Sequence, residues 1–247
     1  MQDNTFTDPR DGQVYKIVKI GEQIWFAENF RYRDFASSVY NNDESNEEKY
    51  GRLYLLSAAM YGVPDGWHLP TISEWEQLKK YIEANTKTPV GTALKSKTDW
   101  NADPRTPTGT DEFGFNALPA GFKNLLRKHV GLKKNTWFWA APDDEDIDDG
   151  EGFLCNLHHD NEKLCKKWIK SKIDDFRHYS VRLVKGDVKL TQKKKTHQLF
   201  NELAPKCDAE KLNLMWEVEK AMRRFRKEHP DLDYEWGLKT AKEWNVI

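Results

Sequence analysis

Long hydrophobic runs are absent from this chain of 247 residues. No apolar stretch approaches the roughly 20 residues that a helix needs to cross a bilayer, so the sequence predicts no membrane anchor. The first residues, MQDNTFTDPRDG, contain no basic segment followed by an apolar one, and therefore predict no secretory signal. Both absences favour a cytoplasmic protein, with display at the cell surface as the alternative if the native chain starts earlier.

Net charge is also nearly absent, because 39 Lys and Arg balance 40 Asp and Glu to a formal charge of -1. This balance excludes broad electrostatic attraction to nucleic acid, and any site for a polyanion has to be local. Contact with nucleic acid is expected only as part of a nucleoprotein complex.

Aromatic residues are abundant, with 10 Trp, 12 Phe and 9 Tyr. Many stand in short motifs that pair Trp or Phe with a Gly, Pro or Asn turn. This pattern is typical of a domain built from short strands and many loops, in which the aromatic side chains supply the core. In chain order the motifs are FTDPRDGQVYKIVKIGEQIWFAENF, YGRLYLLSAAM, PDGWHLPTISEWEQL, GTDEFGFNALPAGF, TWFWAAP and HYSVRLVKG.

The ordered series of motifs, spread over residues 6–186, closely resembles the Fibrobacter succinogenes major paralogous domain family (FISUMP). This is a set of bacterial domains similar to the C-type lectin fold and distantly to formylglycine-generating enzymes. The resemblance implies an α+β, C-type-lectin-like domain of short antiparallel strands with two helices. We therefore expect a FISUMP domain over residues 1–186 and a helical extension over residues 187–247.

The resemblance also bears on the cysteines. Members of the family often carry one Cys just before the Pro of the PxGWHLP motif and another inside the SVRxV motif, and a bridge between them is implied. Val63 and Leu183 occupy these positions here, which fits a reducing compartment. The cysteines that are present, Cys155, Cys165 and Cys207, are an odd number at unrelated positions.

Turn residues and alternating apolar runs predict the strands. Asp11-Gly12 is a strong hairpin signal ahead of such a run. Two polar stretches without periodicity, 33–49 and 86–112, predict surface loops. Strands are expected at residues 14–20, 23–27, 115–118, 136–141, 152–158 and 179–184.

Two helices are expected within the domain. An Ala- and Leu-rich segment predicts a short one over residues 54–61. A second follows Pro70, where Thr71 and Glu74 have the spacing of a capping box. Its apolar face at helical spacing consists of Ile72, Trp75, Leu78 and Ile82.

The tail, residues 187–247, lacks the aromatic motifs and carries an apolar stripe at three- and four-residue steps. It predicts an amphipathic helix that begins at Asp208 and ends near His229-Pro230, followed by a shorter helix. The tail is interpreted as a helical appendage or docking element that supports a homo-oligomer or a larger assembly. Its expected contact residues are Arg223, Arg224, Phe225, Arg226, Trp236 and Trp244.

Catalytic and metal-binding patterns are weak. His68 of the GWHLP motif has no acid or nucleophile beside it, so it is interpreted as a structural residue. Cys155, His158 and Cys165 have the chemistry of zinc ligands, but neighbouring strand residues point to opposite faces. The acidic run 143–150 fails the calcium-loop template and is interpreted as a solvated loop. No catalytic residue, metal or cofactor is predicted, and the cysteine and histidine set remains a weak metal candidate.

The sequence predicts a non-enzymatic recognition module for a protein or glycan ligand. Proteins of this fold family include variable proteins of diversity-generating retroelements, so such a protein, or a phage or host-interaction protein, is one form of the hypothesis. The alternatives are an assembly protein acting through its C-terminal helices and a metal-dependent enzyme of the formylglycine-generating-enzyme-like fold.

The binding surface is expected within residues 137–178, where aromatic and charged side chains of the kind that dominate interfaces gather. Trp137 and Trp139 share a face of their strand, so alternation cannot separate them. Trp139 matches the Phe-Trp motif of the family that the chain resembles, and this resemblance implies a core position for it. The candidate contact residues are Trp137, His158, His159, Asp174, Asp175, Phe176, Arg177 and His178.

Overall fold

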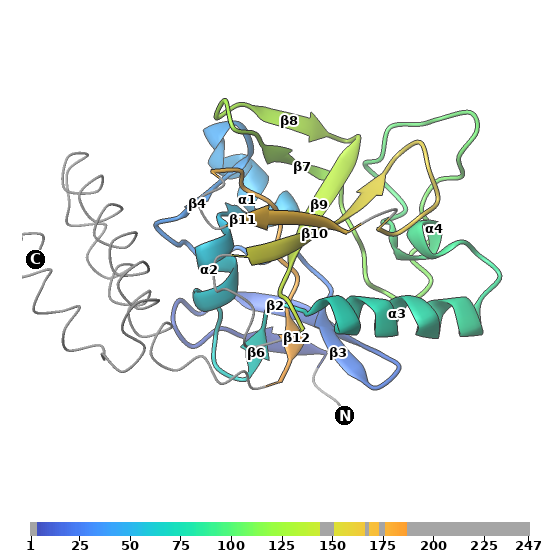
Figure 1. Ribbon diagram of the computed structural model, residues 1–247, viewed down its shortest axis with the longest axis horizontal. Coiled ribbons are helices and arrows are strands. Elements are labelled where there is room, and N and C mark those ends of the chain that lie inside the picture. The colour runs from blue at the N-terminus through green and yellow to red at the C-terminus, as the bar shows by residue number, and fades with distance from the viewer. Residues whose placement is uncertain (1–3, 144–150, 166–167, 173–175, 187–247) are drawn as a thin grey trace, which may run out of the picture. The chain divides into compact units, whose positions relative to one another are not determined.

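A computed structural model describes residues 4–143, 151–165, 168–172 and 176–186, which form an α+β fold of mixed sheets with few helices (Figure 1). The predicted tail helices of residues 187–247, with their proposed contact residues, lie outside this part of the chain, as does most of the acidic run. Among the described residues, no helix is both long enough and apolar enough to cross a membrane.

The first sheet joins the two ends of the described domain. Its strand order is β1-β2-β3-β12-β6, so the last strand is inserted between two strands from the first third of the chain. All its neighbours are antiparallel, and the hairpin predicted around Asp11-Gly12 is confirmed. Its strands are β1 (Thr5–Thr7), β2 (Val14–Ile20), β3 (Gln23–Phe26), β12 (Val184–Lys185) and β6 (Trp67–His68).

The second sheet has the order β11-β10-β9-β7-β8 and lies above the first in Figure 1. Its β7 and β9 are parallel, so the expectation of purely antiparallel strands is wrong at this pair. The reason is that β8 pairs back on β7 as a hairpin, and the next turn reverses the chain again. The strands are β7 (Ala120–Lys123), β8 (His129–Leu132), β9 (Asn135–Ala140), β10 (Glu151–His158) and β11 (Ile169–Lys172).

Gly121 is required where these strands meet. Its φ is +65°, in the left-handed region, and a Cβ there would lie 2.4 Å from the carbonyl oxygen of Val130. Any larger residue would combine an unfavourable φ with a backbone overlap across the β7–β8 hairpin. Glycine at this position therefore permits the close pairing of the hairpin.

Helix α3 (Ile72–Asn85) forms as the sequence predicts. The Thr71 hydroxyl accepts from the Glu74 N–H at 3.2 Å, and the Glu74 carboxylate accepts from the Thr71 N–H at 2.8 Å. Its face of Trp75, Leu78 and Ile82 is buried against the core. The capping box and the helical spacing are both local signals, which is why they could be recognised in the sequence.

The other helices are shorter and were less visible in the sequence. α2 (Leu56–Tyr61) begins two residues later than predicted because Leu53–Tyr54 form β5, which pairs with β4 (Ser37–Ser38). α4 (Val90–Leu94) lies in a stretch predicted as a surface loop, and every residue of it is buried. A helix buried all round carries no amphipathic pattern, so periodicity could not reveal it.

Two predicted strands are wrong in part. Residues 115–118 are not a strand, although Phe115 and Ala117 are fully buried. Of 179–184, only Val184 belongs to a strand, while Tyr179 and Ser180 form isolated bridges. Both segments contribute buried apolar residues to the core, and burial in an irregular segment can give a sequence pattern like that of a strand.

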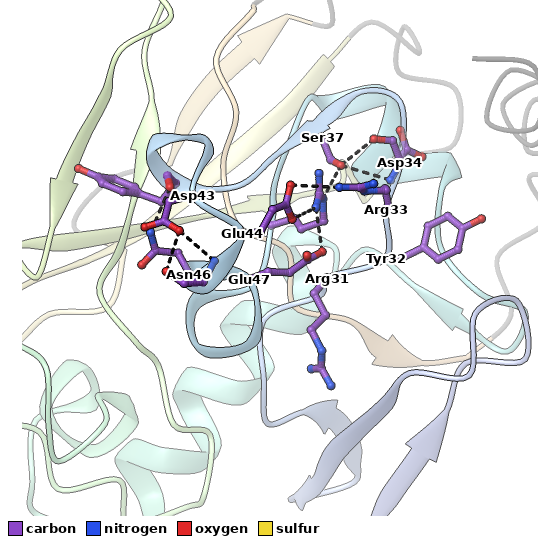
Figure 2. Close-up of polar contacts among 12 residues, drawn as sticks. Arg31, Tyr32, Arg33, Asp34, Ser37, Asp43, Glu44, Asn46 and Glu47 are labelled. Atoms are coloured by element: carbon purple, nitrogen blue, oxygen red, sulfur yellow. Dashed lines mark hydrogen bonds and ion pairs between the residues drawn. The ribbon is translucent and has the colours of Figure 1, made fainter. Parts of the chain in front are cut away.

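The polar stretch 33–49 folds into short elements and is not a plain surface loop. It contains β4, the 3-10 helices η1 (Tyr40–Asn42) and η2 (Glu44–Asn46), and the start of α1 (Glu47–Tyr50). Arg52, 5% exposed, holds it through hydrogen bonds from Nε to the Ser37 hydroxyl at 2.9 Å and from Nη1 to the Glu47 carboxylate at 2.8 Å. Figure 2 labels these two partners, Ser37 and Glu47, among the polar residues of the segment. A polar clamp of this kind has no periodic signal in the sequence.

The core between the sheets and α3 is aromatic. Trp25 and Trp75 have ring centroids 4.9 Å apart, and Phe138 lies 5.5 Å from Trp75. All three side chains are at most 1% exposed. These three aromatic residues of the sequence motifs therefore build the scaffold, as predicted.

Candidate functional site

The two tryptophans of β9 have different environments although they share a face. Trp139 is fully buried, and its indole N–H donates to the Tyr54 carbonyl at 2.8 Å. Trp137 is only half-buried. The prediction that Trp139 belongs to the core is confirmed, and Trp137 is the aromatic residue of the pair that reaches the surface.

Trp137 lies in an aromatic cluster assembled from distant segments. Its ring centroid is 6.0 Å from Phe122 of β7, 6.1 Å from Tyr179 and 6.2 Å from His158 of β10. Asn156 pairs with Trp137 across β9 and β10, so its side chain is on the same side of the sheet. We call this surface the Trp137 face, defined by Phe122, Trp137, Asn156 and His158, against which the buried Tyr179 packs.

Hydrogen-bonding capacity remains unused around β9. Buried side-chain polar atoms normally find a partner, and each exception calls for an explanation. Within the described residues, several such atoms without a partner are concentrated on β8, on β9 or on segments that border β9. They are His129 Nε2, Asn135 Oδ1, Thr136 Oγ1, Trp137 Nε1, His159 Nδ1 and Ser180 Oγ.

Three histidines near this surface have lowered pKa values. Burial is the main cause for each of them. The positive charge of Lys123 lowers the pKa further for His129 and for His178, whose pKa falls to about 3. His158 feels the same kind of repulsion from His159 and Lys95, opposed by Asp160. At neutral pH these imidazoles therefore offer one donor and one acceptor instead of a charge.

Only some of the remaining predicted contact residues lie near this surface. His159 follows His158, and its backbone N–H donates to the Lys134 carbonyl at 2.8 Å. His178 exchanges two backbone hydrogen bonds of 3.0 Å with Lys123, which places the end of segment 176–178 against β7. Phe176 is 43% exposed and Arg177 is half-buried. Asp174 and Asp175 lie outside the described residues.

The weak metal candidate is not assembled as a site. Cys155 and Cys165 pair with each other in a disulfide, with Cα atoms 4.7 Å apart. Cys155 is fully buried toward the core, whereas His158 is on the opposite side of β10. Within the described part of the chain, no three His, Cys, Asp or Glu residues converge as metal ligands.

Cys155 and Cys165 lie together although they are ten residues apart in the sequence and match neither cysteine position of the family. The two residues are brought together because the chain returns after β10, where the Cys165 N–H donates to the Asn156 carbonyl at 3.0 Å. The cytoplasmic location stays a prediction.

His68 makes structural contacts. Its Nε2 lies 2.8 Å from the Glu74 carboxylate, and its Nδ1 lies 3.1 Å from the Gly186 carbonyl. Glu74 also caps α3, so the pair links β6 to the start of that helix and to the end of β12. Asp143, the described part of the acidic run, accepts from the Ser73 N–H at 2.7 Å in the same helical turn. These acidic side chains satisfy amides at the helix N-terminus.

The sequence interpretation missed the β7–β8 hairpin beside the Trp137 face. Phe122 of this hairpin contributes to the cluster, and the tip of the hairpin carries two exposed leucines next to basic residues. The available signal was the segment KNLLRKHVGLKK, which contains several cations and no acid. The near-zero net charge of the whole chain concealed this local excess.

Lys95 is a buried cation near the end of β10. It is 1% exposed, and its Nζ donates to the Asn161 carbonyl at 2.7 Å and lies 5.0 Å from the Trp100 ring. Burial lowers the pKa of Lys95 to about 8, although Glu162 and Asp160 oppose the shift. The folded state therefore releases the lysine proton at a lower pH than the unfolded chain does.

This lowered pKa predicts a pH-dependent stability. Between pH 8 and the ordinary value of 10.5 the unfolded state binds more protons, so the contribution of Lys95 to the free energy of unfolding rises with pH. We expect the stability of Lys95→Met relative to the native chain to fall by up to about 3 kcal/mol across this window. Urea unfolding of both proteins at pH 7.5, 9 and 10.5 measures the difference, with the exposed-site variant Lys87→Met as control. A difference independent of pH would contradict the assigned pKa.

A comparison with known protein families gives one match. No curated protein and no solved structure matches the chain significantly. The family described as the Fibrobacter succinogenes major domain matches residues 18–185, which include both sheets except β1 and the beginning of β2. Since this match spans well over half of the sequence, the chain belongs to the Fibrobacter succinogenes major domain family.

Proposed function

We propose that this protein is a recognition module with a C-type-lectin-like domain, and that the Trp137 face contacts a protein or glycan ligand. The observation that carries the proposal is the contrast within β9. Trp139 is buried with its N–H satisfied, whereas Trp137 reaches the surface with an N–H that has no partner among the described residues. Tryptophan is among the residues that most often dominate binding energy at interfaces.

The chemistry around Trp137 suits a neutral, polar ligand. The aromatic rings of Phe122 and Trp137 provide apolar contact area, and Asn156 and the uncharged His158 add hydrogen-bonding groups. Sugar rings and protein loops both present apolar patches next to hydroxyl or amide groups. A ligand acceptor that approaches after a small side-chain movement would satisfy the Trp137 N–H.

Buried residues of the motifs build the scaffold, whereas Phe122 and Trp137, from two of the same motifs, are half-buried and belong to the Trp137 face. Trp25, Trp75 and Arg182 come from three different motifs and are at most 1% exposed. In the retroelement form of the proposal, the Trp137 face is the part rewritten by a reverse transcriptase. A near-copy of the coding segment that differs mainly at adenines, next to a reverse-transcriptase gene, would support that form.

The proposal predicts that the double variant Trp137→Ala/His158→Ala loses its ligand while the domain stays folded. A binding hot spot contributes about 2 kcal/mol or more, so affinity should fall at least about 30-fold. Each full-length protein is used to capture ligands from an extract of the encoding organism. Its binding to a glycan array is measured separately. Tyr81→Ala, at a 39% exposed site on α3, is the matched control. Equal capture by all three proteins would contradict the proposal.

A further inference from the structure

The tip of the β7–β8 hairpin is a tight turn with an ordered backbone. The Asn124 N–H donates to the Lys128 carbonyl at 2.9 Å, and the Arg127 N–H donates to the Asn124 carbonyl at 2.9 Å. The Asn124 side chain accepts from the Lys128 N–H at 3.0 Å. The hairpin is at the upper edge of the domain in Figure 1. Its turn residues are therefore held in place and point away from the sheet.

The apex of this turn carries Leu125 and Leu126, which are 60% and 76% exposed. They are the most exposed large apolar side chains among the described residues. Turn positions usually carry Gly, Asn, Asp, Ser or Pro, each for a conformational reason that leucine does not supply. Neither the packing nor the turn geometry requires leucine at these two positions.

Positive charge surrounds the two leucines. Lys123 precedes them, and Arg127 and Lys128 follow them. None of these three cations forms an ion pair with a carboxylate in the described part of the chain. The tip thus combines an apolar apex with an uncompensated basic flank.

We propose that this tip, residues 123–128, docks on an anionic lipid surface, with Leu125 and Leu126 entering the interface and Lys123, Arg127 and Lys128 contacting lipid phosphates. This interaction goes beyond the ligand recognition assigned to the Trp137 face, and it uses different side chains. Cations near a membrane are attracted by its negative surface potential, and apolar side chains gain by leaving water at the boundary of the acyl chains.

The shape of the tip favours a lipid surface over an acidic protein. Two adjacent leucines at the apex of a two-stranded hairpin form a projection and not a groove. A fluid lipid interface accepts such a projection without a matching cavity, whereas a protein partner would need a complementary pocket. The cations flank the two leucines on both sides in the sequence, so basic side chains adjoin the apolar apex.

Vesicle co-sedimentation of the full chain tests the proposal. We expect binding to phosphatidylcholine vesicles that contain phosphatidylserine, weaker binding without phosphatidylserine, and loss of binding as salt is raised. Leu125→Ser/Leu126→Ser should reduce the partition coefficient about tenfold or more. Lys123→Gln/Arg127→Gln/Lys128→Gln should reduce it about a hundredfold, because each cation near the surface contributes about fivefold.

The matched control is Lys133→Gln/Lys134→Gln/Lys163→Gln, which removes the same charge from exposed positions away from the tip. This control should bind within about threefold of the native chain. Circular dichroism checks that every variant is folded. The proposal is overturned if the native chain does not bind vesicles that contain phosphatidylserine. It is overturned equally if the control substitutions weaken binding as much as the tip substitutions do. It is also overturned if soluble polyglutamate captures the chain and the vesicles do not, since that result would indicate an acidic protein partner.

Discussion

Replacing Arg182 with methionine is expected to unfold the domain or to bring it close to unfolding at room temperature. The Arg182 guanidinium is fully buried and donates to four oxygens. Nε donates to the Asn29 side chain at 2.7 Å, and the two terminal nitrogens donate to the carbonyls of Phe26, Phe115 and Asn116 at 2.6 to 3.0 Å. Methionine fills much of the volume but leaves these acceptors without donors in the interior.

The size of the effect follows from the desolvation of those oxygens. A buried acceptor without a partner costs about 1–3 kcal/mol, and four of them cannot all recover a partner. We therefore expect a loss of about 3–5 kcal/mol or more, against a typical domain stability of about 5–15 kcal/mol. Arg182 also lies over the rings of Phe115 and Phe138, with its central carbon 4.7 and 5.8 Å from their centroids. The substitution thus weakens the first sheet and the segment that joins it to the second.

Burial lowers the pKa of Arg182 to about 9, against the opposing charges of Glu28 and Asp111. Burying a cation carries a large desolvation cost, which the hydrogen bonds donated by Arg182 have to offset. Urea unfolding of Arg182→Met measures the loss, and Arg105→Met, at an exposed site, should change stability by less than about 0.5 kcal/mol. If Arg182→Met is as stable as the native chain, the carbonyls have other donors and the structural role of Arg182 is wrong.

Trp75→Ala is expected to have an effect of similar size for a different reason. Trp75 is 1% exposed and packs on Trp25, Phe115 and Phe138 with centroid distances of 4.9 to 5.9 Å. Removing the indole leaves a cavity that a packed aromatic core cannot close, at a cost of about 3–5 kcal/mol. Thermal unfolding should show a decrease in Tm of at least about 8 °C.

Trp75→Phe is the control that separates the loss of ring contacts from the loss of the indole N–H, because this N–H is buried without a partner among the described residues. Phenylalanine keeps most of the ring contacts and removes this donor, so its cost should be below about 1.5 kcal/mol. Trp137→Ala, at the half-buried position of β9, should lose less stability than Trp75→Ala. A reversed order for the two alanine variants would contradict the assignment of Trp75 to the scaffold and Trp137 to the surface.

Local signals explain what could be predicted from the sequence. The capping box of Thr71 and Glu74 and the spacing of Trp75, Leu78 and Ile82 specify α3 without help from the rest of the chain. Alternation alone could not separate Trp137 from Trp139, because they share a face of β9, and the match of Trp139 to the family's Phe-Trp motif identified it as a core residue. In these elements the same residues determine both the local conformation and the burial.

Tertiary contacts explain what could not be predicted. The parallel pairing of Gly121 with Thr136 depends on the path of a hairpin whose four-residue strands are too short to give a periodic signal in the sequence. The pairing of Cys155 with Cys165 depends on the return of the chain after β10. For the candidate site, residue type alone indicated Trp137 and His158, but Phe122 joins them only through the order of the second sheet.

The most direct test of the proposed function is photo-crosslinking from the Trp137 face. The photoreactive residue p-benzoylphenylalanine is placed at position 137 of the full chain, and in separate proteins at positions 81 and 236, and each is irradiated in an extract of the encoding organism. We predict one discrete adduct from position 137 and none from position 81, at an exposed site on α3. An adduct only from position 236, in the tail, would contradict recognition by the Trp137 face and would favour assembly through the C-terminal segment.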